Sequence, residues 1–198
     1  DFMQPSDLTR GEFLNRNGNS PEKFFAVFGK PVGHSLSPLM QNAALREIEK
    51  TDSSFRGSKY FAFEVSPESL GDALKEFWRK NFGGINLTIP HKEVAMKIVS
   101  DFDDSAKLAN ACNTLLRTEN GWKGFNTDGF GITAAAEYAF GKSFGNADVV
   151  ILGAGGAARG AAAAIIGAGC KSLLVANRNA ERLQKFADDL TVGNFKIV

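Results

Sequence analysis

Cysteine and histidine are scarce in this sequence, and so is net charge. The chain of 198 residues has two cysteines, Cys112 and Cys170, which lie far apart in apolar surroundings and match no disulfide, metal or redox spacing. We therefore expect two buried free thiols. The two histidines, His34 and His91, do not group with the cysteines, so we predict no metal site.

Long apolar runs and a surplus of one charge are also missing. No stretch is apolar enough to span a bilayer, and no secretory signal is recognisable. A net charge of +1 gives no reason to expect nucleic acid or a membrane as a partner. With 43% hydrophobic and 23% charged residues, the composition is ordinary for a globular protein. We expect a cytoplasmic location, or an organelle after import.

The most informative pattern lies in residues 149–178. Apolar runs at 149–152 and 173–176 predict two strands, and an alanine-rich stretch between them predicts a helix that ends near residue 168. Glycines follow the first strand at once. Strand, glycine turn, helix and strand in this order form the first unit of a dinucleotide-binding fold, although a glycine turn that only packs a helix on a strand is the alternative.

Each small residue of this turn has a physical role. Gly153 allows a tight turn out of the strand, and Gly155 lets the backbone approach a pyrophosphate closely. Ala158, at the third position of the fingerprint, is small enough for the helix to pack on the sheet. The unpaired N–H groups and positive dipole end of the helix N-terminus would face the phosphates.

The end of the second strand selects the cofactor. An NAD site usually places an acidic residue there to accept the ribose hydroxyls, but this chain has Asn177 and Arg178. A guanidinium can grip a 2′-phosphate through charged hydrogen bonds, which a carboxylate would repel. The sequence therefore favours NADP over NAD, with a solvated surface role for Arg178 as the alternative.

The N-terminal half places two hydroxyls after its first strand. An apolar run at 24–28 predicts that strand, and a loop follows over residues 29–38. Ser37 before Pro38 predicts a helix start, with Ser37 as the N-cap. Ser35 and Ser37 thus lie where small ligands bind in open α/β sheets, unless both only cap the backbone.

A later strand and a hairpin add further polar groups. Gly83-Gly84 should break the helix predicted over 67–80, before a strand at 85–89 that shows Asn86 and Thr88 on one face. Lys92 follows at the next helix start, where the alternative is a surface lysine. Residues 112–125 predict a hairpin with a T-E-N-G turn, and Asp128 then begins a helix, either as a functional group or simply as a cap.

Together these stretches resemble the shikimate dehydrogenase family. The matching segments are G-K-P-V-G-H-S-L-S-P, G-I-N-L-T-I-P-H-K, A-C-N-T-L, G-F-N-T-D-G-F-G, G-A-G-G-A-A-R-G and A-N-R. Their order and spacing agree over residues 24 to about 190. The resemblance implies an α/β enzyme that interconverts 3-dehydroshikimate and shikimate with NADP in aromatic amino-acid biosynthesis. Its N-terminal α/β substrate-binding domain would precede a partial Rossmann dinucleotide-binding domain.

The resemblance also implies roles for individual residues. Ser35 and Ser37 would bind the substrate carboxylate, and Lys92 and Asp128 would form the catalytic pair. The ring hydroxyls would be held by Asn86, Thr88, Asn113 and Asp128, and Lys92 would also contact the substrate. The cofactor would contact Gly153, Ala154, Gly155, Gly156, Ala157, Asn177 and Arg178. Asn179 stands where the family often has Thr, which weakens the NADP prediction only slightly.

The chemistry is consistent with this assignment. Reduction of a ketone needs a hydride from the nicotinamide and a proton for the oxygen. The ammonium of Lys92 can donate that proton and stabilise the developing negative charge, which is worth ~10²–10⁴-fold in rate. The carboxylate of Asp128 would orient Lys92 and bind a hydroxyl.

The predicted organisation is a polar extension at 1–22, a substrate domain at 23–125 and the first half of a dinucleotide domain at 126–198. Because family members are longer, we expect a chain truncated or incomplete at its C-terminus. The partner is a small molecule, and the chain is a monomer or homodimer. Two alternatives stay open: a quinate or dual quinate/shikimate dehydrogenase, and a non-catalytic binding module or inactive fragment.

Overall fold

The computed structural model describes residues 23–190. The predicted polar extension at 1–22 and residues 191–198 of the predicted dinucleotide domain lie outside this range. Within the described range the chain forms two compact units. The first contains the chain up to His91 and residues Thr114–Lys123; the second contains Lys92–Asn113 and the chain from Gly124 onward. These units reflect spatial contacts, and the predicted sequence domains at 23–125 and 126–198 remain a prediction.

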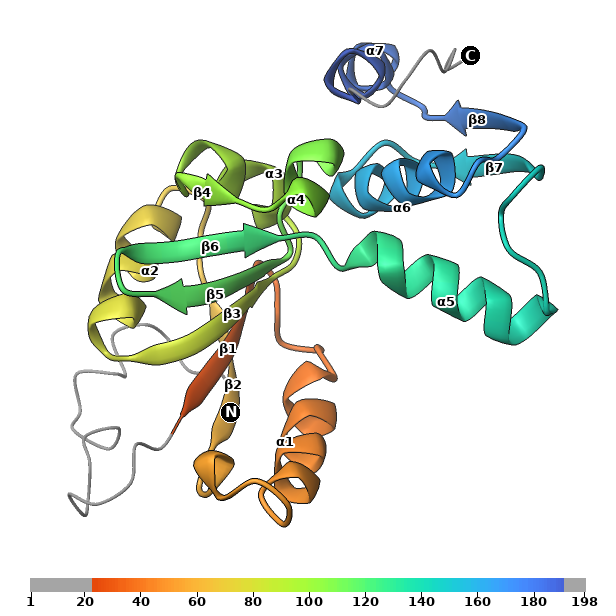
Figure 1. Cartoon of the computed structure of the whole chain (residues 1–198). Coiled ribbons are helices and arrows are strands. Elements are labelled where there is room, and N and C mark those ends of the chain that lie inside the picture. The colour runs from red at the N-terminus through yellow and green to blue at the C-terminus, as the bar shows by residue number, and fades with distance from the viewer. Residues whose placement is uncertain (1–22, 191–198) are drawn as a thin grey trace. The chain divides into compact units, whose positions relative to one another are not determined.

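The first unit is built on a mixed sheet (Figure 1). Its strands run in the order β2-β1-β3-β5-β6. Their bounds are β1 Phe24–Gly29, β2 Lys59–Glu64, β3 Phe82–Leu87, β5 Thr114–Thr118 and β6 Gly121–Phe125, of which the last two residues belong to the second unit. β1 is parallel to both β2 and β3, whereas β5 is antiparallel to β3 and places Thr114 opposite Asn86. The predicted hairpin is therefore confirmed as β5 and β6.

Helices cover both faces of this sheet. The side chains of β1 alternate between the two faces, so each face carries apolar groups that a helix can bury. On one face, Val27 packs with Leu45 of helix α1 (Ser37–Ile48). On the other face, Phe28 meets Phe77 of helix α2 (Leu70–Arg79) edge to face, with ring centroids 4.7 Å apart. A short 3₁₀ turn, η2 (Ser53–Phe55), precedes β2. Helices packed on both faces of a sheet are typical of the α/β class.

Two local predictions need correction. Gly83 and Gly84 lie inside β3 and do not end the helix before it. A Cβ atom on Gly84 would lie 3.1 Å from the carbonyl oxygen of Leu115, so close strand pairing uses the missing side chain. Helix α2 begins at Leu70, later than predicted, because residues 66–69 form a turn in which the N–H of Ser69 donates to the carbonyl of Ser66.

The second unit contains the glycine-turn segment predicted from sequence. Strands β7 (Asp148–Leu152) and β8 (Ser172–Ala176) are parallel, and helix α6 (Gly156–Gly167) connects them. The rest of the unit consists of helices and short elements: α3 His91–Val94, which straddles the division, η3 Ala95–Lys97, β4 Asp101–Phe102, α4 Asp104–Ala109, α5 Asp128–Phe140 and α7 Ala180–Asp189. The predicted strand, turn, helix and strand are confirmed.

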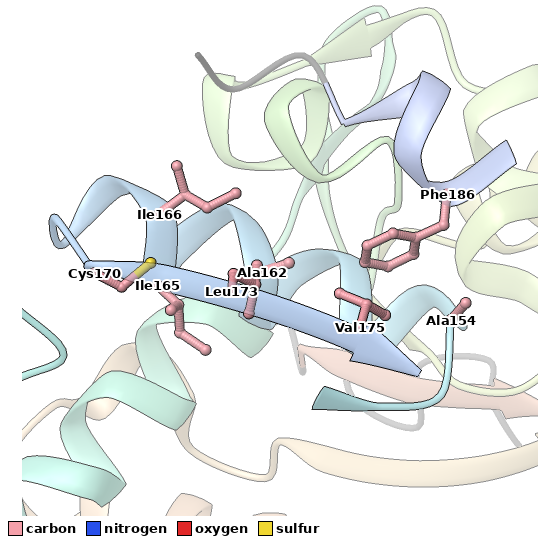
Figure 2. Packing of buried hydrophobic residues seen from close by; sticks show 8 residues of the cluster. All are labelled: Ala154, Ala162, Ile165, Ile166, Cys170, Leu173, Val175 and Phe186. Carbon is pink, nitrogen blue, oxygen red and sulfur yellow. The ribbon is translucent and has the colours of Figure 1, made fainter. Parts of the chain in front are cut away.

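A compact apolar cluster holds this segment together. Figure 2 shows Leu173 and Val175 of β8 packed with Ala162 of α6 and Phe186 of α7. Phe186 is fully buried, and Cys170 lies at the edge of the cluster as a buried free thiol, as predicted. Burial raises the pKa of the Cys170 thiol, so it stays protonated. The cluster fixes the helix and the glycine turn that precedes it.

Candidate functional site

The second unit contains a partly buried ion pair. The ammonium of Lys92 donates to Oδ2 of Asp128 at 2.7 Å, and the two side chains are only 15% and 22% exposed. Lys92 comes from α3 and Asp128 begins α5, 36 residues later. The positive end of the α5 dipole favours a carboxylate there. The predicted catalytic pair is thus brought into direct contact.

Asn113 holds the carboxylate from its other side. Its amide nitrogen donates to Oδ1 of Asp128 at 2.8 Å and to the hydroxyl of Thr127 at 3.0 Å. Its amide oxygen accepts from the backbone N–H of Thr127 at 3.0 Å. Because both ends of the amide are engaged, Asn113 and Asp128 orient each other. The sequence motif pointed to Asn113, but it gave no sign of the bonds to Thr127.

Helix α6 fits against this pair because it carries glycine at two points of contact. A Cβ atom on Gly156 would lie 2.8 Å from Cβ of Lys92. A Cβ atom on Gly160 would lie 2.5 Å from Oδ1 of Asn126 and 2.9 Å from Cβ of Asp128. Ordinary side-chain contacts are not this short, so only glycine fits. The helix that follows the glycine turn therefore packs directly on the ion pair.

The glycine turn itself borders an open pocket of about 410 Å³. Gly153 has φ +109°, in the region that favours glycine, and Gly155 precedes α6 without a side-chain cap. The pocket is lined by the turn, by the end of β8 and by α7: Gly153, Ala154, Gly155, Asn177, Arg178, Asn179 and Arg182. Gly156 and Ala157 form the first turn of α6. Five of the seven predicted cofactor residues thus lie together around one hollow.

Arg182 is a lining residue that the sequence analysis missed. Its Nε donates to the carbonyl of Ala154 at 3.0 Å, which ties α7 to the glycine turn. Asn179 caps α7 by accepting the N–H of Arg182 at 2.8 Å. The signal was available: an Asn cap followed three residues later by Arg places that Arg in the first helical turn, beside the cap.

In the first unit, Ser35 and Ser37 lie close to one another. The hydroxyl of Ser35 accepts the backbone N–H of Ser37 at 3.3 Å, and helix α1 begins at Ser37 itself. The predicted N-cap role of Ser37 is wrong, because the cap residue is Leu36 and no side chain caps this end. The hydroxyl of Ser35 thus bonds to the backbone, which agrees with the alternative prediction for this residue.

Asn86 belongs to a separate hydrogen-bonded group in the first unit. Its amide oxygen accepts from the hydroxyl of Tyr60 at 2.6 Å, and its amide nitrogen donates to Oγ1 of Thr114 at 3.1 Å. Burial raises the pKa of Tyr60, which keeps the phenol protonated as the donor. Tyr60, Asn86 and Thr114 also line a pocket of about 250 Å³. Tyr60 and Thr114 were not anticipated.

Thr88 and His91 form a tight turn after β3. The carbonyl of Thr88 accepts the N–H of His91 at 2.8 Å, and the methyl of Thr88 packs over Gly29. His91 is fully buried, and its Nε2 donates to the carbonyl of Val65 at 2.9 Å. Burial lowers the pKa of His91. His91 thus packs in the interior of the first unit and bonds to the backbone there.

Comparison with known proteins identifies the family. The shikimate dehydrogenase substrate-binding domain model matches residues 27–115, and the shikimate/quinate 5-dehydrogenase model matches residues 134–198. The NADP(+) shikimate dehydrogenase of Synechocystis is 37% identical over 88% of this chain, and that of Moorella thermoacetica is 42% identical over 83%. The chain belongs to the shikimate dehydrogenase family.

A solved structure agrees with this assignment. The shikimate 5-dehydrogenase of Thermus thermophilus, in complex with NADP(H) and shikimate, is 36% identical and superposes with a TM-score of 0.73. The match covers 89% of this chain and 62% of the Thermus chain. The matched part of the chain spans 58% of the length of the Synechocystis protein and 54% of the Moorella protein. Shikimate dehydrogenases of this kind share the α/β class predicted here.

Two features are absent from residues 23–190. Within that range no helix is both long and apolar enough to cross a membrane. The described part of the chain also brings together no group of three or more His, Cys, Asp or Glu side chains able to hold a metal ion.

Proposed function

We propose that this chain carries the catalytic pair and the adenosine-binding turn of an NADP-dependent shikimate dehydrogenase, which interconverts 3-dehydroshikimate and shikimate. The observation that carries the proposal is the contact between Lys92 and Asp128, packed against the helix that follows the glycine turn. Membership of the shikimate dehydrogenase family supports the reaction and the cofactor. The substrate domain would be residues 23–125 and the dinucleotide domain would begin at 126.

Lys92 would transfer the proton, and Asp128 would hold Lys92 in position. In reduction, the Lys92 ammonium donates a proton to the ketone oxygen and stabilises the charge that develops on it. In oxidation, the same nitrogen takes the hydroxyl proton back. Asp128 holds Nζ of Lys92 at 2.7 Å and is itself held by Asn113, so the proton donor has a defined position. When bound, NADPH supplies the hydride.

The pocket at the glycine turn fits the adenosine end of NADP. Its lining carries two guanidinium groups, Arg178 and Arg182, and no carboxylate. Arginine forks match phosphate geometry, and an acidic partner for the ribose hydroxyls is absent from the lining residues. Gly153, Gly155 and the first turn of α6, which contains Gly156 and Ala157, would lie against the pyrophosphate. Asn177 would contribute with Arg178 at the 2′-phosphate.

The substrate would be recognised through its carboxylate and its ring hydroxyls. The hydroxyls of Ser35 and Ser37 would bind the carboxylate, and Asn86, Thr88, Asn113 and Asp128 would hold the ring. In Asn113 and Asp128 these groups are already fixed by mutual hydrogen bonds, which lowers the entropic cost of binding. We therefore propose a small molecule as the partner. The protein itself would be a monomer or a homodimer.

Two other functions are favoured by specific observations. One matching family model covers quinate as well as shikimate dehydrogenases, so quinate is the rival substrate. The second alternative is a binding module, which takes up a ligand in the pocket at the glycine turn without turnover.

The test combines titration calorimetry with nicotinamide absorbance. We expect shikimate to bind more tightly than quinate, and turnover to be fastest with shikimate and NADP⁺. Faster turnover of quinate would replace the proposed substrate. Binding of shikimate and NADP⁺ without turnover would support the binding module, and failure to bind either molecule would refute the proposed function.

A further inference from the structure

The carboxylate of Glu93 lies between two arginines of the second unit. Its Oε1 accepts from Nη2 of Arg182 at 3.1 Å, and its Oε2 lies 3.8 Å from Nε of Arg159. Glu93 is the residue next to Lys92 in α3, whereas Arg182 lines the pocket at the glycine turn. One acidic side chain therefore joins the segment of the proton donor to the cofactor pocket.

The two arginines differ in their need for Glu93. Arg159 is 1% exposed, and a buried cation of this kind requires a negative partner. Asp189 supplies one, at 3.1 Å from Nη2 of Arg159, and the ring of Phe186 lies 5.3 Å from the guanidinium. Arg159 thus keeps a carboxylate if the charge of Glu93 is removed. Arg182 is about half exposed and lines the pocket, and Glu93 pairs with it although Glu93 is not itself one of the lining residues.

We propose that Glu93 is a positioning residue that limits the affinity of the pocket for a 2′-phosphate. The inference rests on the proposed function, because it assumes that the pocket takes the adenosine end of NADP. Glu93 orients Arg182 against the turn and at the same time neutralises part of its charge. The pocket would otherwise present two uncompensated guanidiniums, Arg178 and Arg182, to a phosphate dianion. Weaker binding of the 2′-phosphate would speed dissociation of the cofactor after the reaction.

The Glu93→Gln variant separates the two effects of Glu93. Glutamine keeps an oxygen that can accept from Arg182, so the guanidinium stays oriented. The negative charge is lost, so attraction between Arg182 and a phosphate dianion increases, whereas a ligand without a 2′-phosphate gains little. Asp189→Asn is the matched control, because it removes a carboxylate that pairs with Arg159 rather than with Arg182.

The experiment is calorimetric titration with adenosine 2′,5′-bisphosphate and with 5′-AMP, which differ only in the 2′-phosphate. The parent chain should prefer the bisphosphate. In Glu93→Gln the ratio of the two affinities should rise roughly threefold to tenfold, a gain that shrinks as salt is added. Asp189→Asn should leave the ratio unchanged. Glu93→Asp, whose shorter side chain draws the carboxylate away from Arg182, should raise the ratio less, and it serves as the test variant if Glu93→Gln does not fold.

Two outcomes would overturn the inference in distinguishable ways. A parent that prefers the bisphosphate, with a ratio unchanged or lower in Glu93→Gln, leaves the NADP proposal in place and refutes the role of Glu93. A parent without preference refutes both, because the pocket then does not read a 2′-phosphate.

Discussion

Lys92 Nζ and Asp128 Oδ2 lie 2.7 Å apart, although the two residues come from different helices. Neither group is held by this contact alone. The backbone carbonyl of Lys92 accepts the N–H of Cys112 at 2.8 Å, and the N–H of Asp128 donates to Oδ1 of Asn126 at 3.0 Å. The pair is therefore fixed through backbone as well as side-chain bonds, which is what a positioned proton donor requires.

Asp128→Asn should lower kcat by roughly 10²-fold or more, since it removes the carboxylate that orients the proposed proton donor, Lys92. The new amide oxygen can still accept from Asn113, but its nitrogen is a donor and cannot accept from Lys92. Steady-state kinetics with shikimate and NADP⁺ measure the change. The control is Asp104→Asn, an exposed carboxylate in the first turn of α4 that pairs with Lys107 at 3.6 Å. Equal rates for the two variants would contradict the role of Asp128.

Gly160→Ala should destabilise the protein by about 1–3 kcal/mol, because the added methyl would overlap Asn126 and Asp128. Gly167→Ala is the matched control in the same helix. A Cβ atom there meets no atom within 4 Å, so it should stabilise by about 0.4–1 kcal/mol through the unfolded state. Urea unfolding of both variants gives the two free energies. Destabilisation by Gly167→Ala, or none by Gly160→Ala, would show that α6 does not pack on the pair as described.

His91 should make the free energy of unfolding fall as pH is lowered. Burial lowers the pKa of His91 in the folded state, whereas in the unfolded chain it returns to about 6.5. Below pH ~6.5 the unfolded state binds a proton that the folded state does not, so acid favours unfolding; above that pH the stabilisation is complete. The difference in urea midpoint between pH 7.5 and 5.5 should be larger for the parent than for His91→Gln, which keeps a donor for Val65. Identical differences would be inconsistent with a neutral buried imidazole.

Arg178→Ala should weaken binding of NADP⁺ by roughly 10- to 100-fold and leave NAD⁺ almost unaffected, because a hydrogen bond to a charged group is worth about 1.5–3 kcal/mol. Lys185→Ala removes an exposed cation on α7 and controls for the loss of one positive charge outside the pocket lining. Titration with both dinucleotides provides the comparison. Equal weakening of NADP⁺ and NAD⁺ binding would mean that Arg178 does not read the 2′-phosphate.

The local pattern of the sequence was enough to predict the glycine-turn unit. Its apolar runs and its glycines determine strand, turn and helix within one continuous segment, and β7, α6 and β8 confirm them. The position of Gly153 at a positive φ also follows from the residue type. Within this segment the order of strand, turn and helix follows from the residues themselves.

Contacts between distant segments were less predictable. The hydrogen bond from Tyr60 to Asn86 depends on the order of the strands, in which β1 separates β2 from β3. Gly83 and Gly84 resemble a break in sequence, yet strand pairing needs them within β3. The ion pairs of Glu93 with Arg182 and Arg159 join residues far apart in the chain, and no local period or spacing in the sequence predicts them.

The most direct measurement of the central claim is shikimate-dependent reduction of NADP⁺, followed by nicotinamide absorbance, for the parent chain, Lys92→Ala and Lys97→Ala. Lys97 is an exposed lysine five residues further along the chain, so its loss controls for charge and handling. We predict activity in the parent and in Lys97→Ala, and a loss of ~10²–10⁴-fold in Lys92→Ala. Parental activity in Lys92→Ala, or an equal loss in both variants, would contradict the assignment of Lys92 as the proton donor.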